Sequence, residues 1–257
     1  MDRFLSETTL LDFSTSNIQE LITKEQWNQL NLYDRIGGIY SFVRDSVRFG
    51  YNKADDLPAS VILSDGYGQC NTKGILLMAL FRACGIPCRI HGFTIDKKLQ
   101  KGAITGIWYI LSPKSIIHSW VEIYYKDSWI NLEGFILDKN YISSLQRKFS
   151  TATTSFCGYG VATTCFNNPE IEWVGKDTYI QKEGINADLG VFDTPDTFFK
   201  EHPQTLSKLK KVIFQKYTRH VMNRNVNRIR SKNRGVFQNE QPQPSFSSDK
   251  TDNPFMR

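Results

Sequence analysis

The sequence contains no run of about 18 apolar residues, and its start, MDRFLSETTLLDFST, lacks the basic region, apolar stretch and cleavage site of a signal peptide. We therefore expect an unprocessed chain without an integral membrane segment. Cysteine is also scarce, with five irregularly spaced residues that do not make a disulfide framework. The sequence shows no repeat with a period of about 20 to 50 residues, which argues against a solenoid or a propeller. These absences predict a cytoplasmic globular protein with reduced thiols, one of which can be reactive.

Acidic residues are missing from one part of the chain. Residues 202–238 contain ten Lys or Arg and no Asp or Glu, whereas residues 1–201 carry 20 bases and 23 acids. Residues 239–257 are poor in branched aliphatic residues and rich in Pro, Ser, Asn, Gln and Asp, which is typical of disorder. The remainder of a chain that is 40% hydrophobic is long enough for one substantial core with an appendage.

Hydrophobic spacing predicts helices first and strands later. Helices are expected over 16–21, 24–30, 32–47 and 71–84, and the last is apolar around most of its circumference and is followed by Gly85 and Pro87. Strands are expected over 88–94, 107–111, 116–125 and 128–132. This order predicts an α+β fold in which a buried central helix packs on an antiparallel sheet.

The stretch DGYGQC places Cys70 at the start of this central helix. Most cysteines are small buried hydrophobic residues, and a core role is the simpler reading for this one. Its position favours a nucleophile, because free N–H groups and the positive end of the helix dipole stabilise a thiolate and an oxyanion. Gly66 and Gly68 would permit a close approach there.

A nucleophilic cysteine needs a base, and the chain has four histidines. His202 and His220 lie in the basic segment, and His91 lies on a strand beside the helix. In IHSWVEIYY, alternation puts His118 on the face opposite to Val121, so that it faces away from the more apolar side. A structural role for His118 remains an alternative.

An acid can be placed by hairpin geometry. If Lys126 and Asp127 form a two-residue turn, Glu133 lies diagonally across the strand pair from His118, close enough for a carboxylate to hold the imidazole. A turn that is one residue longer would make Asn131 or Glu122 the competitor.

Together these segments resemble the transglutaminase-like superfamily of papain-type cysteine enzymes, with a Cys-His-Asp/Glu triad. The resemblance covers roughly residues 39–138. The matching positions are Gly68, Cys70, Arg82, Gly85, Ile86, Pro87, Arg89, His118, Trp120, Val121, Glu122, Trp129 and Leu132. The usual acid of the family is Asp, and this sequence has Glu133, which is one methylene longer.

The resemblance implies covalent acyl chemistry. Cys70 would attack an amide, ester or thioester carbonyl of a peptide, protein or small acyl substrate, and His118 would carry the proton, with no cofactor or metal. Tyr51 and Gln69 are candidates to support the oxyanion. A metal site from Cys84, Cys88 and His91 is conceivable but lacks a fourth ligand.

The rest of the chain extends beyond the family pattern. Residues 150–201 are rich in aromatics and glycines and form either a substrate-binding lid or an irregular wrap over the sheet. Trp120, Cys157 and Tyr159 are candidate substrate-binding residues, and Cys157 is also a second candidate thiol. We divide the chain into a helical segment (1–38), a catalytic core (39–149), this extension (150–201), a basic helix (202–235) and a disordered tail (236–257).

The basic helix combines an apolar stripe with a dense cationic face over 205–234. It either docks on the domain or binds an acidic partner, but nucleic acid is not expected because no aromatic-rich motif accompanies it. The sequence therefore predicts a thiol hydrolase or acyltransferase. The alternative is a catalytically silent binding protein whose basic helix engages an acidic partner.

Overall fold

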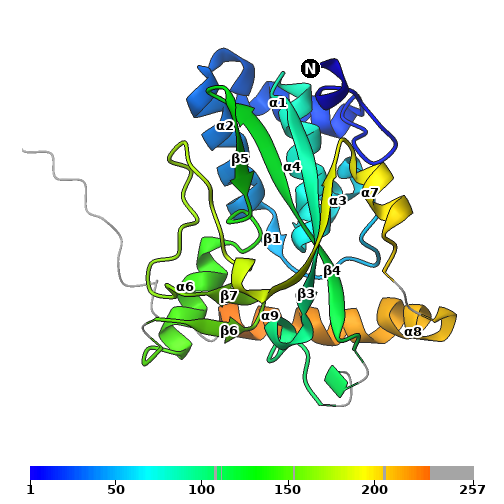
Figure 1. Ribbon diagram of the computed structural model, residues 1–257, viewed down its shortest axis with the longest axis vertical. Coiled ribbons are helices and arrows are strands. Elements are labelled where there is room, and N and C mark those ends of the chain that lie inside the picture. The colour runs from blue at the N-terminus through cyan, green and yellow to red at the C-terminus, as the bar shows by residue number, and fades with distance from the viewer. Residues whose placement is uncertain (107–108, 111, 153, 205–206, 232–257) are drawn as a thin grey trace, which may run out of the picture.

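The computed structural model describes residues 1–106, 109–110, 112–152, 154–204 and 207–231 (Figure 1). The α-helices are α1 (Ser16–Glu25), α2 (Leu32–Ser41), α3 (Ala59–Asp65), α4 (Cys70–Ala83), α6 (Lys139–Lys148), α7 (Pro195–Glu201), α8 (Lys208–Ile213) and α9 (Arg219–Ser231). The strands are β1 (Arg48–Phe49), β2 (Tyr67–Gly68), β3 (Cys88–Asp96), β4 (Ser115–Tyr125), β5 (Ser128–Leu132), β6 (Phe156–Gly158), β7 (Val161–Thr163) and β8 (Ile185–Phe192). Short 3-10 turns are η1 (Asp2–Phe4), η2 (Trp27–Gln29), η4 (Lys97–Gln100) and η5 (Lys182–Gly184), and η3 (Phe42–Ser46) and η6 (Phe214–Thr218) are π-helical.

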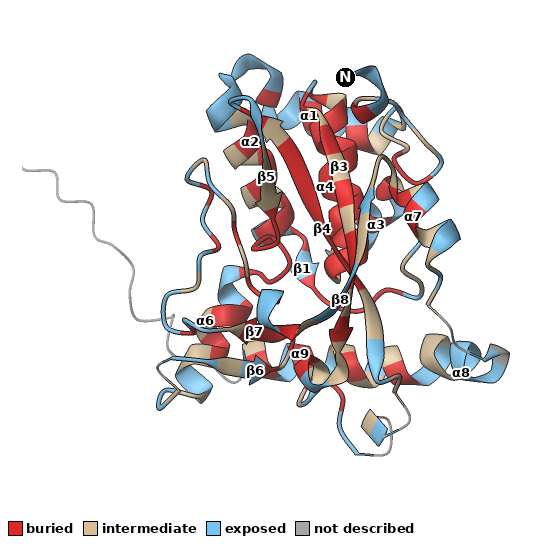
Figure 2. Cartoon of the chain, viewed as in Figure 1, coloured by how far each residue is buried: buried red, intermediate tan, exposed pale blue. Residues whose placement is uncertain are grey.

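Helix α4 is the central element, as predicted, and its bounds differ from the expected ones by one residue. It is buried along nearly its whole length, and Figure 2 shows it between the sheet and the surrounding helices. Its apolar residues cover all sides because β4 packs on one side and α2 and α3 on others. Gly85, with a φ of 72°, then turns the chain into β3.

The main sheet is antiparallel and has the order β5-β4-β3-β8. Lys126 and Asp127 form the expected two-residue turn between β4 and β5, with φ values of 49° and 61° that match the twist of a tight hairpin. Tyr125 pairs with Ser128, so the predicted register is confirmed. Helices and an antiparallel sheet around one core confirm the α+β class.

Several predicted boundaries are wrong. Helix α1 runs through residue 25 and ends where Gln26 takes a left-handed φ of 55°, so the predicted helix over 24–30 is replaced by the end of α1 and a 3-10 turn. The helix predicted over 32–47 becomes regular α2 followed by the π-turn η3. Tyr109 and Ile110 are helical where a strand over 107–111 was expected, and residues 107, 108 and 111 lie outside the described residues.

Residues 150–201 contribute to the sheet itself. Strand β8 pairs with β3 along its edge, and β6 and β7 form a separate hairpin. The following basic segment runs as α8, η6 and α9 along one end of the molecule (Figure 1). The predicted tail, 236–257, lies outside the described residues.

Helix α9 is attached to the domain by its apolar stripe and by one arginine. Met222, Val226 and Ile229 are buried. The guanidinium of Arg230 forms an ion pair with Asp138 and donates a hydrogen bond to the carbonyl of Phe49 at 3.0 Å. Within the described part of the chain, no helix has the length and apolar composition needed to cross a membrane.

Candidate active site

Cys70 is the first residue of α4 and is 8% exposed. The preceding residue, Gln69, caps the helix: its side chain accepts from the backbone of Thr72, and its own N–H donates to the Thr72 hydroxyl at 3.0 Å. A Cβ atom on Gly68 would lie 2.6 Å from this hydroxyl, so the glycine is required by close packing against the cap. The first-turn N–H groups of Cys70 and Asn71 have no acceptor within the helix, which gives the thiol a positive electrostatic setting.

His118 lies on β4 and is completely buried. Its Nε2 is 2.8 Å from Oε1 of Glu133, while Nδ1 has no hydrogen-bond partner among the described residues. Burial alone would lower the pKa of His118, but the adjacent Cys70 sulfur and the Glu133 carboxylate outweigh it and raise the pKa to about 10. The three side chains therefore lie together, and their charges favour an imidazolium at neutral pH.

Glu133 directly follows β5 and is also completely buried. One carboxylate oxygen faces His118, and the other accepts hydrogen bonds from the backbone N–H groups of Ile180 and Gln181, both at 2.9 Å. A buried carboxylate needs several such partners to remain ionised. The segment at 178–181 thus fixes the acid, and no sequence motif indicated this role.

The side chain of Asn71, at the start of α4, forms hydrogen bonds with the two residues of β4 that flank His118. Its amide nitrogen donates to the carbonyl of Ile117 at 3.1 Å, and its carbonyl oxygen accepts from the hydroxyl of Ser119 at 2.9 Å. Since these partners flank His118, the two hydrogen bonds hold the strand against the residue that follows Cys70. Sequence reasoning missed Asn71, and its place next to the cysteine was the only available signal.

The two competitors for the role of the acid are occupied elsewhere. Glu122 binds Arg89 at 2.6 Å and His91 at 2.7 Å on another part of the sheet. The amide of Asn131 donates to Asp177 and to the hydroxyl of Tyr179. Only Glu133, among these three, contacts His118 in the described structure.

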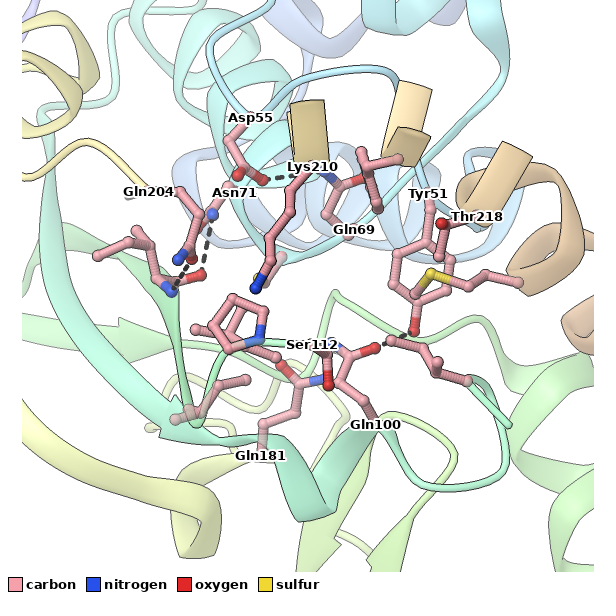
Figure 3. A pocket seen from close by; sticks show the side chains of 18 of the residues that line it. Tyr51, Asp55, Gln69, Asn71, Gln100, Ser112, Gln181, Gln204, Lys210 and Thr218 are labelled. Carbon is pink, nitrogen blue, oxygen red and sulfur yellow. Dashed lines mark hydrogen bonds between the residues drawn. The ribbon is translucent and has the colours of Figure 1, made fainter. Parts of the chain in front are cut away.

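A cavity of about 190 Å³ opens beside Cys70 (Figure 3). Tyr51 and Gln69 both line it. The Tyr51 hydroxyl donates to Gln100 at 2.8 Å, and the Gln69 amide nitrogen donates to Asp55 at 3.0 Å. Burial raises the pKa of Tyr51 well above its usual value and also raises the pKa of Asp55. Both proposed oxyanion groups therefore adjoin the cavity but already hold a hydrogen-bond partner.

The three candidate substrate-binding residues lie elsewhere. Trp120 is buried against Phe93, with ring centroids 4.1 Å apart, and does not line the Cys70 cavity. Cys157 and Tyr159 line a different cavity, which shares Ile104 with the first. Only their residue type and the segments in which they lie indicated a role in substrate binding.

The other cysteines lack the environment of Cys70. Burial raises the pKa of Cys84 and of Cys88 to about 11 each, so both thiols stay protonated at neutral pH. Burial also raises the pKa of Cys157. No group of three or more His, Cys, Asp or Glu side chains within the described residues could hold a metal ion, and Cys84, Cys88 and His91 do not form one.

An α+β core with a cysteine at the start of its buried helix and a histidine–carboxylate pair on adjoining strands has the layout of a papain-type fold. Comparison with known families is consistent with this layout. Residues 20–134 match the family model described as the transglutaminase-like superfamily, so a domain of this superfamily occupies that part of the chain. The match supports a cysteine enzyme as the general class.

No curated protein matches the chain. One similar solved structure is described as a "putative cysteine protease" from Cytophaga hutchinsonii. It is 15% identical, with a TM-score of 0.43, and the similarity covers 75% of this chain and 47% of that one.

Proposed function

We propose that the protein is a cysteine hydrolase or acyltransferase that acts on an amide or thioester carbonyl through an acyl-enzyme on Cys70. The observation that carries this proposal is the 2.8 Å contact between His118 Nε2 and Glu133 Oε1, together with a Cys70 sulfur near enough to raise the pKa of the same buried ring. A carboxylate that fixes one ring nitrogen leaves the other to exchange a proton with a nucleophile.

The reaction begins when the Cys70 proton is held by His118 and the sulfur attacks the acyl carbon. The negative charge that develops on the carbonyl oxygen is stabilised by the free N–H groups at the start of α4. The bond to the leaving amine or thiol then breaks, and the imidazolium returns its proton to that group. A thioester between Cys70 and the acyl group remains.

Deacylation repeats these steps with water or an amine as the attacking group. The His118 ring removes a proton from the attacking molecule, the bond between sulfur and carbon breaks, and the thiol is restored. Water gives hydrolysis, and an amine gives acyl transfer. Throughout the cycle Glu133 keeps the ring oriented and stabilises its positive charge.

Tyr51 and Gln69 are proposed as further support for the oxyanion. Each lines the cavity, so each can approach the substrate carbonyl. Tyr51 would have to exchange its hydrogen bond to Gln100 for one to the oxyanion, and Gln69 retains a second amide hydrogen besides the one donated to Asp55.

Alkylation by iodoacetamide tests the proposal at the level of the thiol. We expect Cys70 to be alkylated at about pH 6 at least about tenfold faster than the exposed Cys157, because the adjacent His118 ring can hold the thiol proton as the sulfur attacks. The fast phase should vanish in Cys70→Ala and slow markedly in His118→Ala. Cys157→Ser is the matched control and should leave it unchanged.

Acylation tests the proposal at the level of the reaction. Incubation with p-nitrophenyl acetate should release a burst of nitrophenol and leave an acetyl group on Cys70, detected by peptide mass spectrometry. Uniformly slow alkylation of all five cysteines, together with no adduct on Cys70, would refute the proposed function.

A further inference from the structure

The cavity beside Cys70 has a predominantly apolar wall. Its apolar side chains come from strands, loops and the C-terminal helical segment, and they include Ile95, Ile104, Ile116, Ile213, Phe214 and Met222. Cavities of about 150 Å³ lined by such side chains admit a ligand the size of benzene. The volume of about 190 Å³ therefore has room for a branched aliphatic or aromatic group.

Most polar groups in the wall already have partners within the protein. Besides the Tyr51–Gln100 and Gln69–Asp55 hydrogen bonds, the side-chain oxygen of Gln204 accepts from the backbone N–H of Ile117 at 2.8 Å. Polar groups that are satisfied internally gain little from a polar ligand and lose their partners if they turn toward it. The wall thus favours an apolar occupant.

Gln181 differs from these three residues. Gln181 is 3% exposed, and its side-chain oxygen, Oε1, is buried without a hydrogen-bond partner among the described residues. The amide nitrogen donates to the carbonyl of Gly160 at 2.6 Å, which fixes which end of the amide is the oxygen. Figure 3 shows this side chain among those that line the cavity.

The position of Gln181 connects this acceptor to the reaction centre. Its backbone N–H holds Oε2 of Glu133 at 2.9 Å, so the residue is fixed by the same contact that orients the acid. A buried acceptor without a partner is costly and is satisfied when a ligand supplies an N–H or O–H group. The occupant should therefore be apolar and carry one donor.

We propose that the cavity binds the acyl half of the substrate as an apolar aminoacyl group, with its side chain against the isoleucines and its N–H donating to Gln181 Oε1. This inference rests on the proposed function. A simple fatty acyl group would fill the apolar space but leave Oε1 unsatisfied, whereas an N-acylated leucine or phenylalanine residue supplies both features. Gln181 and Ile213 are then determinants of specificity.

The test compares the p-nitrophenyl esters of N-acetyl-L-leucine, 4-methylpentanoic acid and acetic acid as substrates. Each enzymatic rate is divided by the rate at which free imidazole cleaves the same ester, so that differences in intrinsic reactivity cancel. The first two carry the same branched side chain, and only the first has the N–H. We expect kcat/KM to be highest for the N-acetyl-leucine ester, by roughly 10- to 100-fold over the 4-methylpentanoate, because the second leaves a buried acceptor unpaired. The acetate should be the poorest.

Two variants separate the contributions of the wall and the acceptor. Ile213→Gln, at a half-buried position, should remove most of the advantage of both longer esters over acetate, whereas Val212→Gln, at its exposed neighbour outside the cavity, should not. Gln181→Met should bring the ratio of the N-acetyl-leucine ester to the 4-methylpentanoate close to one. If Gln181→Met fails to fold, the ratio in the natural protein still decides.

The outcomes distinguish this proposal from the one on which it rests. Equal normalised rates for the three esters, with an adduct on Cys70, would overturn the aminoacyl pocket and leave the proposed function standing. A preference for 4-methylpentanoate over N-acetyl-leucine would likewise overturn the role of Gln181. No adduct on Cys70 with any ester would overturn the proposed function and this inference together.

Discussion

Replacing Cys70 by alanine should change the titration of a residue that is far away in the sequence. In the folded protein the pKa of His118 rises from its ordinary 6.5 to about 10, against the effect of burial, and the Cys70 sulfur is the largest contributor to the rise. A rise of this size corresponds to roughly 5 kcal/mol of preference for the protonated ring. The alanine variant keeps Glu133 but loses the sulfur, so the pKa of His118 should fall by at least roughly one unit.

The same substitution should alter how stability depends on pH. Because folding raises the pKa of His118, its protonated ring stabilises the folded state fully below about pH 6.5, and this contribution is lost as pH rises toward 10. Lys73 acts in the opposite direction, since burial lowers its pKa from 10.5 to about 7 and its unfavourable charge is lost as pH rises. Lys73 is unchanged in Cys70→Ala, so its effect cancels when the two proteins are compared.

NMR titration of the histidine ring protons gives the pKa directly, with the other three histidines as internal controls and His118→Gln for assignment. Urea unfolding at about pH 6.5 and about pH 9.5 gives the difference in free energy of unfolding, which should decrease more steeply with pH in the natural protein than in Cys70→Ala. An unchanged pKa of His118 in the variant, with parallel stability curves, would refute the pairing of thiol and imidazole.

Three further substitutions, one of them with a matched control, address the carboxylate, the helix cap and the C-terminal helix. Glu133→Asp shortens the side chain by one methylene, so it cannot reach both His118 and the two backbone N–H groups. Acylation by p-nitrophenyl acetate should slow by about tenfold or more, and an unchanged rate would show that the longer side chain is not needed. Gly68→Ala places a Cβ 2.6 Å from the threonine hydroxyl of the cap and should lower the free energy of unfolding by roughly 1–3 kcal/mol. In the control Gly66→Ala, the new Cβ has no atom within 4 Å, and the free energy of unfolding should fall by about 1 kcal/mol because of the φ of 66° alone. Equal losses for the two alanine variants in urea unfolding would contradict the steric argument. Arg230→Met leaves a buried carboxylate without its cation and should cost roughly 3–5 kcal/mol by the same measurement, whereas a loss below about 1 kcal/mol would show that the ion pair does not hold α9.

The elements that the sequence predicted well are those with an unambiguous local pattern. Helix α4 is apolar on all sides, and β3, β4 and β5 alternate between clear turn residues, so their bounds come within one or two residues of the structure. Strand β8 was not predicted because it lies at the edge of the sheet with many half-exposed or exposed residues and contains a glycine. A strand whose stability comes from pairing with β3 carries little signal of its own.

The residues of the candidate site also fall into those that local sequence patterns indicated and those that they did not. Cys70, His118 and Glu133 could be proposed from helix position, strand alternation and a tight turn, all of which are local rules. Asn71 and Gln181 could not, because their roles depend on contacts with segments 46 or more positions away in the sequence. Short motifs therefore indicated the reacting groups, while the residues that hold them and shape the cavity required the three-dimensional structure.

The attachment of α9 has a consequence for the order in which the protein folds during synthesis. The cavity wall includes residues 213, 214 and 222, and their helical segment is fastened by Arg230 to Asp138. A ribosome adds about 5–20 residues per second, so a nascent chain whose residue 181 has just emerged, with the backbone partners of Glu133 already synthesised, still needs roughly 2–10 s to complete this contact. For that interval the thiol and its base can already be in place while the cavity lacks one wall. The binding cavity is thus completed after the reacting groups, and an aminoacyl group could be bound only once α9 has packed against the domain.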